Sequence, residues 1–264
     1  MTEQLQLYEV ALAREEVDEI LVRCGVEALL VGGQALAIWA EYFRVEPVRE
    51  LSEKVTLDVD FIGTRQVAEK LRVALGWNIY FPSIEDATSQ TAKVATTLPG
   101  GGVKQVDFLN AIVGLDTAKV QSRAAELELR SGIRIRILHP LDVLESRLRN
   151  LDILPAKRNS VGIAQAALAI AVAGQFFNLL LESGEPMRIQ LDAVKRITQI
   201  AFDLRLSRVA FDFGLNPLAS VPWLRINSPA FQSKRWPQIL ARAEELNRKH
   251  ADREARRLAR RSRK

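Results

Sequence analysis

Two aspartates, Asp58 and Asp60, stand two positions apart in the stretch 56–62, where most of the other residues are apolar. Side chains at positions i and i+2 of a β-strand point to the same face, so a strand here would present both carboxylates together. Neighbouring carboxylates need a cation between them, and hard oxygen ligands suit Mg²⁺, which also takes oxygens from water and phosphate. Taken alone, the pair is more typical of the wet face of a half-exposed edge strand.

A glycine pair precedes this stretch, and a further aspartate follows it. Residues 28–31 predict a short buried strand that ends at Gly32 and Gly33, and residues 34–43 predict a helix. Glycines let the backbone approach a phosphate closely, and a helix N-terminus offers free N–H groups and a positive dipole end. Asp107 lies in the second arm of a hairpin that the turn at 99–102 predicts over 89–97 and 103–112. The ordered set is more specific than its parts.

This arrangement resembles the DNA polymerase β-like nucleotidyltransferase superfamily over roughly residues 26–112. The stretch 137–144, which leads into a predicted helix, is similar to the start of the helical half in bacterial abortive-infection (AbiEii-like) toxin-type members. The matching residues in the first half are Val31, Gly32, Gly33, Asp58, Asp60 and Asp107.

The resemblance implies a site for two Mg²⁺ ions and a nucleoside triphosphate (NTP). Asp58, Asp60 and Asp107 would be the metal ligands and catalytic carboxylates, and Asp107 would also accept the proton of the attacking hydroxyl. The backbone N–H groups of Gly32 and Gly33 would contact the β- and γ-phosphates.

Three basic residues are further candidates for phosphate contact, although each is individually more typical of a solvated surface. They are Lys70, Arg147 and Lys157.

The order of the predicted elements indicates an α+β fold with a mixed β-sheet and flanking helices, followed by an all-α region. A helix is predicted over 3–24 and another over 65–75, with Thr64 as its N-cap and Gly76 just beyond its end. After Pro140, nearly all of the chain is predicted to be helical, over 141–151, 158–183, 187–206 and 229–262. We therefore expect a nucleotidyltransferase-type domain over 1–138 and a helical domain over 139–264.

The charge of the chain is unevenly distributed. Residues 242–264 hold 10 Lys/Arg and 4 Asp/Glu, whereas residues 1–241 hold 27 basic and 28 acidic side chains. The basic terminal helix indicates either contact with a polyanion such as RNA or a solvated tail. The single cysteine and the lack of an apolar N-terminal signal fit a reducing cytoplasm. The apolar run 163–181 contains polar residues and predicts a buried helix more readily than a membrane span.

These features support two classes of function. The first is a Mg²⁺-dependent enzyme that transfers a nucleoside monophosphate from an NTP to a hydroxyl of RNA, such as tRNA, or of protein. The toxin-type resemblance implies a toxin with an antitoxin partner. The alternative is a catalytically degenerate nucleotidyltransferase fold that acts as an RNA- or protein-binding module. An antibiotic-modifying enzyme is less favoured, since no acidic surface for a cationic drug is evident in the sequence.

Overall fold

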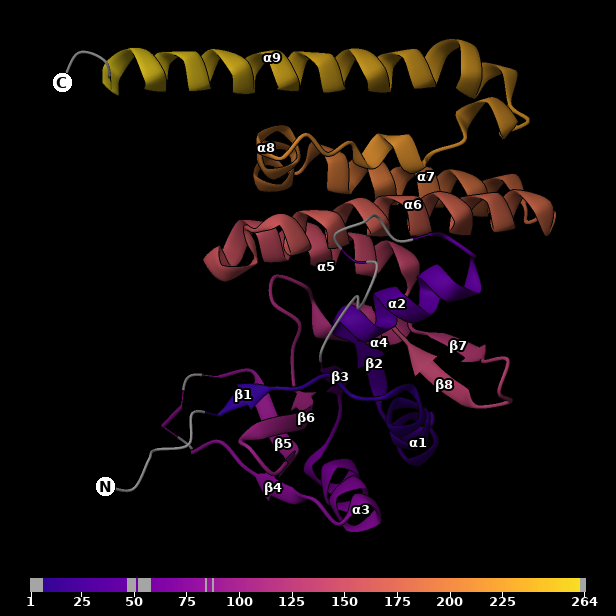
Figure 1. Cartoon of the computed structure of the whole chain (residues 1–264). Coiled ribbons are helices and arrows are strands. Elements are labelled where there is room, and N and C mark those ends of the chain that lie inside the picture. Colours follow the sequence, from indigo (N-terminus) through magenta and orange to yellow (C-terminus); the bar gives the residue numbers. More distant parts are fainter. Residues whose placement is uncertain (1–6, 47–50, 52–57, 84, 87, 262–264) are drawn as a thin grey trace. The chain divides into compact units, whose positions relative to one another are not determined.

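The computed structural model describes residues 7–46, 51, 58–83, 85–86 and 88–261. It divides into two compact units, Met1–Ser146 and Arg147–Lys264, with the boundary inside helix α5 (Pro140–Ile153). The boundary expected from the sequence, near residue 139, lies at the start of this same helix. The expected α+β class, a mixed sheet followed by a helical region, is confirmed (Figure 1).

The first unit is built on a mixed sheet in which seven strands follow the order β4-β5-β6-β3-β2-β8-β7, and β1 pairs with β6. The β2–β3, β4–β5, β5–β6 and β7–β8 pairs are antiparallel, whereas β3–β6, β2–β8 and β1–β6 are parallel. The strands are β1 (Tyr8–Glu9), β2 (Leu29–Val31), β3 (Val59–Ile62), β4 (Asn78–Tyr80), β5 (Gln90–Thr97), β6 (Gly102–Leu109), β7 (Ala125–Glu128) and β8 (Arg134–Ile137).

Helices α1 (Arg14–Cys24), α2 (Gly32–Tyr42), α3 (Arg65–Leu75) and α4 (Thr117–Arg123) connect these strands. α3 packs against β4 and β5 and also against α1, while α2 packs against β2 and β3. The predicted ends of α3 are confirmed, because the Thr64 hydroxyl accepts the Val67 N–H at 3.4 Å and Gly76 is left-handed with φ +66°.

Strands β3 and β6 have one apolar face and one acidic face. Phe61 and Phe108 lie opposite each other in the parallel register, are both buried, and stack with ring centroids 5.6 Å apart. Gly63 follows β3 where any side chain would collide with Phe108, since a Cβ there would lie 2.8 Å from that ring. This packing fixes the register of the two central strands. Asp60 and Asp107, each one position before a phenylalanine, project from the other face.

The predicted N-terminal helix over 3–24 is only partly correct. Residues 1–6 lie outside the described part of the chain, and the helix begins only at Arg14. Tyr8 and Glu9 instead form β1, with the Tyr8 N–H donating to Gly101 O and the Val10 N–H to Val103 O. The start of β6, at Gly102 and Val103, thus pairs with a segment whose own sequence pattern suggested a helix.

The second unit is helical. The predicted helix over 187–206 is wrong as a single element, because it ends at Phe202 and a new helix starts at Leu204. Asp203 causes the break by capping the second helix, since its Oδ1 accepts the N–H groups of Arg205 and Leu206 at 2.9 and 3.0 Å. The helices are α6 (Ser160–Glu182), α7 (Met187–Phe202), α8 (Leu204–Asp212) and α9 (Trp236–Arg261), with short turns at Pro155–Lys157, Pro217–Ser220, Trp223–Arg225 and Phe231–Arg235.

One helix in the described part of the chain, α6, is long and apolar enough to cross a membrane. In its most apolar window, 44% of the residues are buried within the protein. Its buried side includes Leu168, Val172 and Phe177.

Candidate metal centre

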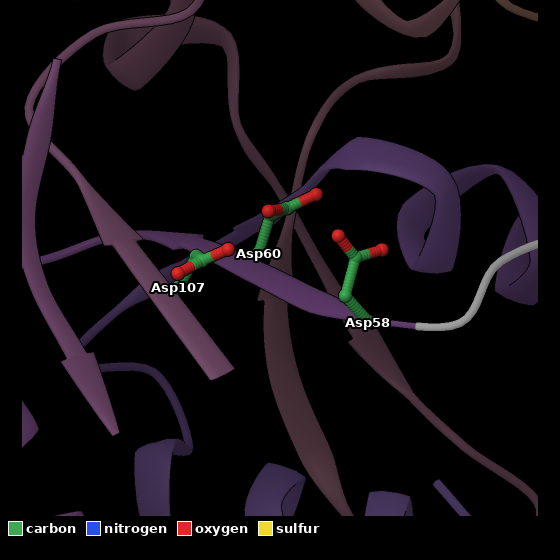
Figure 2. Close-up of side chains that lie close together, drawn as sticks. All are labelled: Asp58, Asp60 and Asp107. Carbon is green, nitrogen blue, oxygen red and sulfur yellow. The ribbon is translucent and has the colours of Figure 1, made fainter. Parts of the chain in front are cut away.

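Three aspartates from two neighbouring strands come together in the first unit. Asp60 in β3 and Asp107 in β6 occupy directly opposite positions of the parallel register, and Asp58 lies just before β3 begins. One carboxylate oxygen from each lies within 4.8 Å of the others, and Figure 2 shows the three groups side by side with Asp60 in the middle. The predicted strand over 56–62 begins at Val59, and Thr56 and Leu57 lie outside the described residues.

Gly32 makes room for this cluster. It has φ +69°, and a Cβ built on it would overlap Oδ2 of Asp60 and lie 2.9 Å from its Cγ. The carboxylate of Asp60 therefore lies directly against the first residue of α2. Gly33 is buried in the first turn of that helix, so the carboxylate of Asp60 lies at the helix end where the N-terminal N–H groups of α2 are found.

Two side chains of β5 hold Asp107 in place. Nε2 of Gln90 donates a hydrogen bond of 2.6 Å to Oδ1 of Asp107, and Nζ of Lys93 lies 3.8 Å from the same oxygen. Lys93 pairs directly with Asp107, while Gln90 pairs with Leu109. A register shift between Gln90 and Ala92 puts these two residues, three positions apart, on the same face as Asp107.

A polar chain continues from Lys93 along the same face. Lys93 Nζ donates to Oε1 of Gln105 at 2.9 Å, and Nε2 of Gln105 donates to Oε1 of Glu9 at 3.1 Å. Gln105 precedes Asp107 by two positions in β6, so both project from the same side. Lys93 is thus oriented by a neutral amide on one side and by a carboxylate on the other.

The electrostatics of Asp107 disfavour a bare carboxylate. Burial raises its pKa above the ordinary value, the negative charges of Asp58 and Glu9 raise it further, and Lys93 and the Gln90 hydrogen bond act in the opposite direction. Its side chain is only 14% exposed. A second positive charge at the cluster would favour ionisation, which is what a bound cation supplies.

The donor set fits a divalent cation. It consists of three half-buried carboxylates, two on neighbouring strands and one just before β3, whose oxygens lie within 4.8 Å of one another. The described residues at the cluster provide no sulfur or imidazole ligand, so hard ions such as Mg²⁺ or Mn²⁺ are favoured over zinc.

Of the basic residues suggested as phosphate ligands, Lys70 has a different partner. It lies in α3, its side chain is 62% exposed, and its Nζ is 2.7 Å from Oε2 of Glu27. The other two belong to the helical unit. Nη1 of the buried Arg147 donates to Oε1 of Gln165 at 3.3 Å, and Lys157 is exposed in the turn Pro155–Lys157.

The basic terminal helix, α9, packs against the other helices of its unit along one narrow face. Trp236 and His250 are buried on one side of α9, and His250 Nε2 lies 3.1 Å from Oγ of Ser207 in α8. Every residue from 255 to 260 is exposed. The arginines at 256, 257 and 260 are therefore available to solvent, with Arg257 also paired to Glu254 at 2.9 Å.

The sequence reasoning missed Gln90 and Lys93. Counting back from the turn at 99–102 pairs Thr97 with Val103 and therefore Lys93 with Asp107, so the position of Lys93 was available from the hairpin. Gln90 was not, because the register shift that brings it onto that face leaves no mark in the sequence.

No protein-family model and no curated protein matches this chain. Among solved structures, the chain is similar to the crystal structure of JHP933 from Helicobacter pylori, with 10% identity and a TM-score of 0.33. The match covers 93% of this chain and 95% of that one.

Proposed function

We propose that this protein is a Mg²⁺-dependent nucleotidyltransferase that moves a nucleoside monophosphate from an NTP to a hydroxyl of RNA or protein. The observation that carries the proposal is the convergence of Asp58, Asp60 and Asp107, with Asp60 lying against the glycine that opens α2. A metal site alone would need only the carboxylates. The glycine pair at a helix N-terminus beside it adds backbone donors suited to phosphate oxygens.

Each part of the site has a role in this reaction. Asp58, Asp60 and Asp107 would hold the metal, which when bound neutralises phosphate charge and aligns the attacking and leaving oxygens. The N–H groups at Gly32 and Gly33 bind the terminal phosphates of the NTP. Gln90 fixes one oxygen of Asp107, and the other carboxylate oxygen accepts the proton of the acceptor hydroxyl.

The experiment is a transfer assay with two labels. Wild-type protein is incubated with Mg²⁺, total RNA and each NTP labelled either on the α- or on the γ-phosphate. We expect the α-label, and not the γ-label, to enter macromolecules, because nucleotidyl transfer retains the α-phosphate and releases pyrophosphate. The double variant Asp58→Asn/Asp60→Asn should lose this incorporation by at least about 100-fold, since ligand loss costs no less than loss of a supporting residue.

Incorporation of the γ-label would indicate a kinase instead. Equal incorporation by the double variant and the wild type would reject the proposed site. Lys70→Ala serves as the matched surface control, because its ammonium pairs with Glu27 rather than with the cluster, and it should transfer as the wild type does.

A binding role without catalysis is the second candidate, and the exposed arginines of α9 favour it. It predicts no label transfer to any acceptor. It also predicts RNA binding that weakens steeply with salt and is lost when the chain is cut before residue 242. The toxin role rests on the sequence resemblance, and growth arrest on expression, relieved by Asp60→Asn, would support it.

A further inference from the structure

A hollow of about 690 Å³ lies in the helical unit, where α7 and α9 are in contact. All of its lining residues fall between positions 191 and 242, so the hollow belongs to this unit alone and shares no residue with the acidic cluster. Cavities of about 300–1,000 Å³ are the size in which proteins bind small molecules.

Two walls of the hollow are single faces of helices. On α7, Lys195 follows Leu191 by four positions and precedes Phe202 by seven, so the three lie on one side of that helix. On α9, Ile239 and Arg242 are three positions apart and also share a side. The hollow is therefore built into the packing of the two helices.

The least exposed part of the lining is apolar, and we call it the floor. Val194 and Phe231 are buried, and Leu191, Phe202 and Ile239 are half-buried. Apolar surface that stays in contact with water gains free energy when an apolar group covers it. The floor thus favours a ligand with an apolar body.

The exposed part of the lining is mostly cationic. Lys195, Arg235 and Arg242 come from three different elements, and Asp192 is the single acid, which leaves two net positive charges. Within the described part of the chain, none of the three cationic groups forms an ion pair or donates a hydrogen bond. The Arg242 guanidinium lies over the Phe202 ring, 4.5 Å from its centroid, which leaves its N–H donors without an oxygen acceptor.

An uncommon backbone turn supplies both kinds of lining residue. Phe231–Arg235 is a π-helical turn that leads into α9. Pro237 accounts for it, because this residue has no N–H to donate to Ser233, four positions earlier. The turn puts Phe231 into the floor and Arg235 among the exposed cations. Turns of this kind are rare and are frequently found at functional sites.

We infer that this hollow binds a small amphipathic anion, an apolar body that carries a phosphate or carboxylate head. The body covers the floor, and the head is bound by the cations around it. A nucleotide fits less well, since Phe231 is buried and Phe202 is covered by Arg242, so neither ring is open to a base. The inference is independent of the proposed function, because it concerns a second ligand at a separate site.

The test is calorimetric titration of the full chain with octyl phosphate, below the concentration at which this probe forms micelles. We expect one site per chain. Arg235→Gln removes a charged donor and should weaken binding about 5- to 50-fold. Asp192→Asn removes the one acid of the lining and should strengthen binding about 2- to 5-fold, an increase that loss of structure would not produce.

The matched control is Arg256→Gln, which removes an exposed arginine of α9 outside the hollow and should bind within about 2-fold of the wild type. The unfolding temperatures of all variants without ligand show that each is folded. Octyl phosphate should raise that of the wild type and of Arg256→Gln more than that of Arg235→Gln.

Three further ligands separate the contributions of the head and the body. Octylammonium has the same body with the opposite charge, AMP has the phosphate on a polar body, and anionic vesicles offer many phosphates on a surface. Displacement of octyl phosphate by octylammonium, AMP binding as tight as that of octyl phosphate, or vesicle binding without binding of octyl phosphate would each overturn the inference. Wild-type affinity in Arg235→Gln would overturn it as well.

Discussion

Asp107 in the sheet unit and Asp203 in the helical unit are both partly buried carboxylates with a basic neighbour, yet their surroundings act in opposite directions. Asp203 accepts two backbone N–H groups at the start of α8, and Nη2 of Arg149 lies 2.9 Å from its Oδ2. Burial alone would raise its pKa, but these contacts outweigh burial and hold the pKa below the ordinary value. The pKa of Asp107 is raised, because burial and neighbouring acids outweigh Lys93 and Gln90.

The difference distinguishes an acid that stabilises the fold from one for which we propose a function. Asp203 has the partners that its charge requires, so its ionised form stabilises the fold. Asp107 is placed among acids, and Lys93 and Gln90 compensate its burial only in part, so its ionised form costs stability until a cation binds. Sites that carry a cost of this kind are where function is usually found.

Among the residues that support the cluster without belonging to it, Gln90 should have the largest effect on transfer. Gln90→Leu removes the hydrogen bond to Oδ1 of Asp107 and leaves the carboxylate free to rotate, so nucleotidyl transfer should fall about 10- to 100-fold. The rate is measured under saturating NTP. Gln121→Leu, on the exposed side of α4, is a matched control with no expected loss. An unchanged rate in Gln90→Leu would show that the orientation of Asp107 does not matter.

Asp203→Ala should lower the free energy of unfolding by about 1–2 kcal/mol, because it removes the N-cap of α8 together with the Arg149 pair. Asp203→Asn retains a good capping side chain and should lose less. Urea unfolding at pH 7 provides both values. A variant as stable as the wild type would mean that the cap contributes nothing to the break between α7 and α8.

Asp107→Asn should change the free energy of unfolding in the opposite direction. With a chelator present at pH 7, we expect the variant to be more stable than the wild type by about 0.5–2 kcal/mol, since it removes a charge whose ionisation is disfavoured. Mg²⁺ should then raise the unfolding temperature of the wild type and leave that of the variant unchanged. A destabilised variant that still responds to Mg²⁺ would contradict the metal-site interpretation.

The smallest effect is in the pH dependence of these differences. The folded pKa of Asp203 is below 3.8, so its stabilisation is complete above pH 3.8 and is lost as pH falls through the folded value. The folded pKa of Asp107 is above 3.8, so its destabilisation is complete above that folded pKa and disappears as pH falls to 3.8. In urea titrations from pH 7 to pH 3, the free energies of unfolding of Asp203→Ala and Asp107→Asn should therefore approach that of the wild type from opposite sides. Differences that grow on acidification would refute this assignment.

The acidic cluster was predictable from the sequence because its members are marked by local patterns. Asp58 and Asp60 share a strand period, Asp107 stands between apolar neighbours after a clear turn, and Gly32 follows an apolar run. The contact between Gln90 and Asp107 was not predictable, because it depends on a register shift that only the folded sheet displays.

Two fold elements were also beyond local reasoning. β1 has two residues, too few for a pattern, and exists because β6 offers an edge to pair with. The break between α7 and α8 has no glycine or proline, and depends on Asp203 using its side chain as a cap instead of continuing the helix. The first feature depends on a strand far along the chain, and the second depends on the hydrogen bonds of one side chain.

The most direct measurement of the central claim compares the two aspartates in a single assay. Wild type, Asp107→Asn and Asp203→Asn are each given Mg²⁺, RNA and NTP labelled on the α-phosphate, at a temperature where all three are folded. We predict that Asp203→Asn incorporates label at the wild-type rate and that Asp107→Asn falls by at least about 100-fold. Equal incorporation by the two variants would contradict the account.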